Sequence, residues 1–171
     1  SYLAQRLVSS GRRPATDAKK AAASFTLAAG ESAVFDNGLN DTGFPGLRVD
    51  VKTPGRLVLQ FDEVLSADGE ARGVRRYGDC NALVWDFEQP GVYEVDAFEP
   101  YTMRYVELDV VTGEMTVTAP RFRSYKNPTA KRARFRASDP TLVEVFNAAK
   151  ETFRQNAVDV FMDCPSRERA G

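Results

Sequence analysis

Between residue 24 and about residue 137, apolar and polar positions alternate in short runs separated by Gly, Pro, Asn and Asp. In the clearest run, Leu57, Leu59 and Phe61 are spaced two residues apart. A period of two places successive side chains on opposite faces of a strand, so this spacing predicts an antiparallel all-β unit. The other predicted strands cover 25–27, 47–51, 82–87, 92–95, 104–110, 115–118 and 122–125. About eight short strands predict a β-sandwich of the jelly-roll type.

The run 104–110 carries the sharpest alternation. Apolar residues stand at positions 106, 108 and 110, and Tyr105, Glu107 and Asp109 lie between them. We therefore expect one face of this strand to be in the core and the other to meet water.

The two ends of the chain have a helical rather than an alternating pattern. Leu3 and Leu7 are four residues apart, the spacing of one helical face. Near the other end, Asp139 is a good N-cap and Pro140 suits a first helical position. An amphipathic helix to about residue 156 should come next, with an apolar stripe at Leu142, Phe146, Ala149 and Phe153.

Three parts are expected along the chain. Residues 1–23 form a lead-in, 24–137 the mainly β domain, and 138–171 a C-terminal helix with a charged tail. Pro165 stops any helix after the apolar segment 158–162, so the charged residues at 163–171 should lie on a loop.

Composition narrows the chemistry. The 171 residues are 43% hydrophobic and include no histidine, which removes Ser-His-Asp triads, Cys-His dyads and most zinc or iron sites. Cys80 and Cys164 are far apart and belong to no CxxC pattern. We expect no metal and no cofactor, and acid–base chemistry, if present, falls to carboxylates.

The net charge of −1 gives the molecule no field that would collect polyanions, but seven basic and no acidic residues occupy 121–136. Cations interleaved with aromatic residues can line a single-stranded nucleic-acid groove. They also suit the solvated face of an edge strand, and this is the expectation here, with no nucleic-acid partner.

No apolar run is long enough to span a membrane, so no membrane partner is expected. The sequence begins at Ser1 without a charged-then-apolar signal region, and an excised or processed piece is expected. A periplasmic or secreted location is favoured over the cytoplasm, although the sequence does not determine it.

The final loop places two carboxylates, Asp163 and Glu168, beside Arg167 and Arg169. Two carboxylates in different environments are what glycoside hydrolysis requires, one protonated and one ionised. The alternative is a solvated run of mixed charge, and spacing alone favours that alternative.

A family resemblance reverses this preference. Residues 163–171 read DCPSRERAG, which resembles the active-site motif of the α-L-rhamnosidases of glycoside hydrolase family 78. Residues 35–49 (FDNGLNDTGFPGLRV) and 99–107 (EPYTMRYVE) are similar to two strand segments of the same family. In that family a β-sandwich precedes, through a helical linker, an α/α toroid that houses the active site. The resemblance implies that residues 138–171 comprise this linker helix and the start of the α/α catalytic domain.

The resemblance also implies that Glu168 is the general acid, that Asp163 holds sugar hydroxyls, and that Arg167 orients these carboxylates. The implied substrate is a carbohydrate carrying terminal α-L-rhamnosyl residues, cleaved with inversion at the anomeric carbon. The general base of the family lies in the toroid, so residues 1–171 alone should be inactive. The 140–162 segment should be covered by the rest of the catalytic domain or by a companion chain.

A function of another class also fits the pattern. A non-catalytic sandwich could bind carbohydrate, or only brace a neighbouring domain. Its sugar-stacking candidates are Tyr77, Trp85, Tyr93 and Tyr101, although alternating strand positions favour packing for most of them.

Overall fold

The computed structural model describes the backbone of residues 2–3, 6–11 and 19–20, and residues 24–67, 69, 71 and 81–164 without the side chain of residue 119. The strands are β1 (Tyr2–Leu3), β2 (Arg6–Gly11), β3 (Lys19–Lys20), β4 (Ser24–Ala28), β5 (Glu31–Asp62), β6 (Ala82–Phe87), β7 (Gly91–Asp96) and β8 (Tyr101–Ser124). A 3₁₀ turn, η1 (Thr129–Arg132), and a helix, α1 (Pro140–Asn156), come after them. The chain divides into two compact units, residues 1–124 and residues 125–171.

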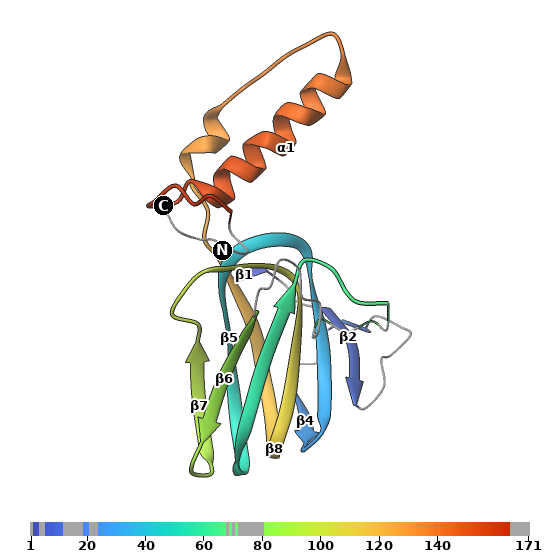
Figure 1. Ribbon diagram of the computed structural model, residues 1–171, viewed down its shortest axis with the longest axis vertical. Coiled ribbons are helices and arrows are strands. Elements are labelled where there is room, and N and C mark those ends of the chain that lie inside the picture. Colours follow the sequence, from blue (N-terminus) through green and yellow to red (C-terminus); the bar gives the residue numbers. More distant parts are fainter. Residues whose placement is uncertain are drawn as a thin grey trace. The chain divides into compact units, whose positions relative to one another are not determined.

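Two long strands, β5 and β8, build both layers of the first unit (Figure 1). All their pairings are antiparallel. The first layer has the order β2, 31–36 of β5, 105–110 of β8, 57–62 of β5, β6. The second has the order β4, 114–118 of β8, 48–51 of β5, β7. The result is a β-sandwich whose layers share two continuous strands.

Both long strands change layer at the same place. Thr53 of β5 is paired with Glu114 of β8, and Arg56 with Thr112. A Cβ atom on Gly55 would lie 2.1 Å from the Thr112 carbonyl oxygen, and Gly113 has φ of 85°. Glycine is therefore required at this crossing, because a side chain would separate the two backbones.

One hydrophobic core lies between the layers. Alternate residues of the paired segments are buried, among them Leu57, Leu59 and Phe61 at no more than 2% exposure. Across the layers, the rings of Phe25 and Phe35 are 5.3 Å apart. The prediction of an antiparallel, mainly β fold followed by a helix is confirmed.

Every strand segment predicted by alternation lies in an observed strand, apart from residue 125, but the segment 31–36 was missed. Ala33, Val34 and Phe35 form a continuous apolar run because all three are buried, Val34 at 2% exposure. A strand buried on both faces lacks the alternation that identifies a half-exposed one.

The expected solvated face of 104–110 is wrong for two of its residues. Glu107 is 1% exposed and Asp109 is 9% exposed. On this face, the backbone N–H of Ala71 donates to the Glu107 carboxylate at 2.8 Å. Gln60 donates to Asp109 at 2.9 Å. These hydrogen bonds offset part of the cost of burying carboxylates.

The helical spacing of Leu3 and Leu7 is also wrong as a predictor. Residue 7 lies in β2, which pairs antiparallel with residues 32–36 of β5. The 31–36 segment would otherwise expose a row of unpaired backbone groups, and pairing with β2 satisfies them.

Among the described residues, no helix is both long and apolar enough to cross a membrane.

We expect Leu57→Ala to lower the free energy of unfolding of the sandwich by about 2–5 kcal/mol, because it leaves a cavity beside the layer crossing. Leu39 is 42% exposed and provides the matched control, since Leu39→Ala should change stability by less than about 0.5 kcal/mol. Denaturant unfolding measures both variants. Equal losses of unfolding free energy in the two variants would show that Leu57 does not belong to the core.

Candidate active site

Helix α1 begins and ends where the sequence predicts. The Asp139 side chain accepts a hydrogen bond of 2.8 Å from the backbone N–H of Thr141, which satisfies a donor of the first turn. Pro140 occupies the first turn, where it removes no helical hydrogen bond. The helix ends at Asn156, and the chain then turns back on itself.

The last backbone carbonyl groups of a helix lack N–H donors within the helix. At the end of α1, neighbouring residues donate these hydrogen bonds. The backbone N–H of Asn127 donates to the Arg154 carbonyl at 2.8 Å, and its side-chain Nδ2 donates to the Ala157 carbonyl at 2.6 Å. The backbone N–H of Met162 donates to the Asn156 carbonyl at 2.8 Å. Residues on both sides of the helix are thus fixed to its C-terminal end.

The orientation of the Asn127 side chain is fixed by hydrogen bonds at both ends of its amide. Its Oδ1 accepts from the backbone N–H of Thr129 at 2.8 Å and from the Thr129 hydroxyl at 2.6 Å. With Oδ1 held in this way, Nδ2 faces the Ala157 carbonyl. We call residues 125–127 the anchoring segment.

Residues 157–163 form what we call the terminal turn. Ala157 and Phe161 form an isolated antiparallel bridge, and the Val158 N–H donates to the Val160 carbonyl at 3.1 Å. Burial raises the pKa of Tyr125 in the anchoring segment, and a hydrogen bond to the Asp159 carboxylate raises it further. The anchoring segment therefore contacts the terminal turn at two points, Ala157 and Asp159.

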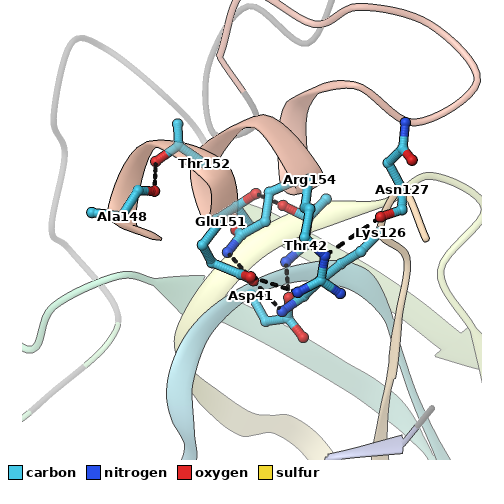
Figure 2. A network of polar contacts seen from close by, with 10 residues as sticks. Asp41, Thr42, Lys126, Asn127, Ala148, Glu151, Thr152 and Arg154 are labelled. Carbon is cyan, nitrogen blue, oxygen red and sulfur yellow. Dashed lines mark hydrogen bonds and ion pairs between the residues drawn. The ribbon is translucent and has the colours of Figure 1, made fainter. Parts of the chain in front are cut away.

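The anchoring segment also contacts α1 through Lys126, which belongs to an ion-pair cluster centred on Glu151 (Figure 2). Lys126 Nζ lies 2.7 Å from Glu151 Oε1, and Arg154 Nη1 lies 2.6 Å from Oε2. Partial burial alone would raise the pKa of Glu151. The hydrogen bond and charge of Lys126, together with the charge of Arg154, outweigh it and hold the pKa of this carboxyl below its ordinary value.

Of the three predicted site residues, the structure describes only Asp163. It is exposed and directly follows Met162, which is 8% exposed and bonded to the helix end. Arg167 and Glu168 lie outside the described residues. The terminal turn therefore determines where the motif at 163–171 begins, and the roles assigned to its three residues stay predictions.

Three cations of the basic run have partners within their own units. Arg121 contacts Glu94 at 2.7 Å and Asp96 at 2.9 Å, and Arg123 lies over the ring of Phe44. Lys126 belongs to the Glu151 cluster. Phe122 of the same run is fully buried, whereas Phe135 is 43% exposed and its ring stacks on Phe146 at 5.1 Å.

The described sugar-stacking candidates pack on the sandwich core. Trp85, Tyr93 and Tyr101 are partly buried against it, and Tyr77 lies outside the described residues. Cys164 is half-buried. Within the described part of the chain, no three Cys, Asp or Glu side chains come together in a group that could hold a metal ion.

Sequence reasoning missed the anchoring segment. One signal was present, because Asn127-Pro128-Thr129 is a typical Asn-Pro turn in which the Asn side chain bonds to a backbone N–H two residues later. That pattern predicts the turn, but not that Asn127 also holds the end of a helix. The pairing of residue 127 with Arg154 and Ala157 depends on the tertiary fold.

Comparison with known proteins gives the same family for the C-terminal part of the chain as the motif at 163–171. Residues 130–171 match the model of the bacterial alpha-L-rhamnosidase 6 hairpin glycosidase domain. No curated protein matches the sequence significantly. The resemblance inferred from the sequence is confirmed over this segment.

Solved rhamnosidase structures resemble the chain over most of its length. A rhamnosidase from Klebsiella oxytoca with rhamnose bound superposes with a TM-score of 0.74 at 20% identity, over 99% of this chain and 37% of that one. A family 78 rhamnosidase of Bacillus sp. GL1 superposes with a TM-score of 0.66 at 23% identity, over 81% of this chain and 14% of that one. An alpha-L-rhamnosidase from Dictyoglumus thermophilum superposes with a TM-score of 0.58 at 18% identity, over 82% of this chain and 16% of that one. At these identities the likeness establishes the fold, and the chain spans well under half of each relative.

The lowered pKa of Glu151 predicts how acid affects the helical unit. A carboxyl whose pKa is lowered by folding adds stability above its ordinary value of 4.5, and that stability is lost as the pH falls below it. Helical circular dichroism should report a loss of α1 stability between about pH 6 and pH 3 that Glu151→Gln makes smaller. Glu144→Gln is the same change at an exposed position of α1 and should behave like the wild type. Identical pH profiles for all three proteins would exclude Glu151 as the cause.

Proposed function

We propose that the chain is part of an inverting glycoside hydrolase that resembles α-L-rhamnosidases and removes terminal α-L-rhamnosyl residues from carbohydrates. The single observation that supports this most strongly is the match of residues 130–171 to a rhamnosidase domain model. The fold of the preceding sandwich agrees with it. The whole activity belongs to a protein of which these residues are one portion.

Within this proposal, Glu168 donates a proton to the leaving oxygen, and Asp163 accepts hydrogen bonds from the sugar hydroxyls. Arg167 lies next to Glu168 in the sequence and orients the carboxylates by charge and hydrogen bonding. Five residues of extended chain span at most about 17 Å, so Asp163 and Glu168 can reach one bound sugar. The fixed position of Met162 at the helix end supports a defined starting point for this loop.

Inversion requires a second carboxylate that activates water on the opposite face of the sugar, about 6.5–9.5 Å from the acid. We assign no such base within residues 1–171. Residues 1–171 on their own are therefore proposed to give no turnover.

The apolar face of the helical unit supports a larger catalytic domain. No residue of α1 is buried, although the helix is amphipathic. Five large apolar residues of α1 and the terminal turn are between 50% and 74% exposed: Leu142, Val145, Phe153, Val160 and Phe161. Because burying such a side chain contributes about 1.5–3 kcal/mol, we propose that further helices of the catalytic domain, or a companion chain, cover this face.

The acid role predicts a loss that depends on the leaving group. In the complete protein, Glu168→Gln should lower kcat about 10²–10⁴-fold on an alkyl α-L-rhamnoside, and less on a nitrophenyl rhamnoside, whose leaving group needs little protonation. The alkaline limb of the pH profile should also disappear. Glu144→Gln supplies the control at an exposed position. Wild-type rates for Glu168→Gln on both substrates would rule out the general-acid assignment.

The exposed face predicts the behaviour of the isolated chain. Residues 1–171 should self-associate in light scattering and bind a dye specific for apolar surfaces, and Phe153→Glu with Phe161→Glu should reduce both effects. Phe98 is fully exposed in the sandwich unit, so Phe98→Glu is the matched control and should change little. A clean monomer without dye binding would contradict the proposal that this face needs a cover.

A further inference from the structure

We infer that Asn127 is a positioning residue for Asp163, acting through the terminal turn and the helix end rather than by contact with substrate. This inference rests on the proposed function, because it assumes that Asp163 holds sugar hydroxyls. It adds a residue that lies 36 positions earlier in the sequence and outside the motif at 163–171.

The path from Asn127 to Asp163 is short and continuous. Asn127 Nδ2 holds the Ala157 carbonyl, and Ala157 is bridged to Phe161. The next residue, Met162, is bonded to the Asn156 carbonyl and is itself buried. Asp163 comes directly after it, so its backbone position is set by this chain of contacts.

The exposure of Asp163 makes such support necessary. A side chain on an exposed loop can adopt many positions, and productive binding requires placement to within about 0.5 Å. Two apolar residues of the terminal turn, Val160 and Phe161, are 52% and 74% exposed, whereas Ala157 and Met162 are buried. Hydrogen bonds from the anchoring segment and the helix end restrain the turn directly before Asp163.

The bonds of Asn127 are specific to an amide. Its Oδ1 must accept two hydrogen bonds from Thr129 while its Nδ2 donates to Ala157, and only Asn has both groups at this length. Asp at this position would keep the Thr129 bonds but would set a carboxylate against the Ala157 carbonyl, at the negative end of the helix dipole. Asn127→Asp is therefore a small change that removes one link of the path.

A double-mutant cycle in the complete protein tests the inference, with the dissociation constant of L-rhamnose measured by calorimetry. Asp163→Asn should weaken binding about tenfold and Asn127→Asp about fivefold. The double variant should be no weaker than Asp163→Asn alone, because both changes remove the same interaction. A merely structural role of Asn127 would lower stability but leave the two binding effects multiplicative.

Two further variants complete the experiment. Asn147→Asp makes the same chemical change at an exposed position of α1 and should leave binding unchanged. If Asn127→Asp does not fold, Tyr125→Phe removes the hydroxyl that bonds to Asp159 in the same turn, and it should weaken binding about threefold with the same non-additivity.

The outcomes separate this inference from the proposed function. A wild-type protein that does not bind L-rhamnose contradicts the function itself. A wild type that binds, combined with multiplicative effects or with normal binding by Asn127→Asp, overturns the positioning role alone. Unchanged binding by Asp163→Asn removes both the sugar contact and the role inferred for Asn127.

Discussion

The antiparallel pairing of β5 with β8 is the constraint on which the sandwich depends. Among the described strands, every one except β3 pairs with β5 or β8. Because both strands run through both layers, their crossing at Gly55 and Gly113 sets the position of one layer relative to the other. The single core between the layers results from this geometry, since alternate residues of the same two strands face it.

The helical unit depends on a different kind of interaction. No residue of α1 is fully buried, although the ring of Phe146 stacks on Phe135 at 5.1 Å. Hydrogen bonds to the helix end and the Glu151 ion pairs hold the anchoring segment, α1 and the terminal turn together. Polar bonds of this kind are directional, so they define positions more sharply than apolar contacts of the same area. Such a unit suits the start of a site in which a carboxylate must be placed accurately.

The sequence predicts those parts of the fold that local pattern determines. Alternation identifies the half-exposed strands, and Asp139 with Pro140 identifies the start of α1. It fails where burial is not local. Val34 is covered on a face that alternation cannot reveal, and buried Glu107 accepts a hydrogen bond from Ala71, more than thirty residues earlier in the chain. Of the candidate site, the motif at 163–171 can be recognised from residue order. The contact of Asn127 with Ala157 joins residues thirty positions apart and requires the fold.

The central claim is that the terminal turn presents Asp163 and the loop after it to a rhamnosyl unit. A crystal structure of the complete protein with an α-L-rhamnoside bound tests it most directly. We expect an Asp163 carboxylate oxygen at about 2.6–3.2 Å from a sugar hydroxyl, and a Glu168 carboxyl at a similar distance from the glycosidic oxygen. A sugar bound to the sandwich instead, or one with no polar contact to either carboxyl, would contradict the claim.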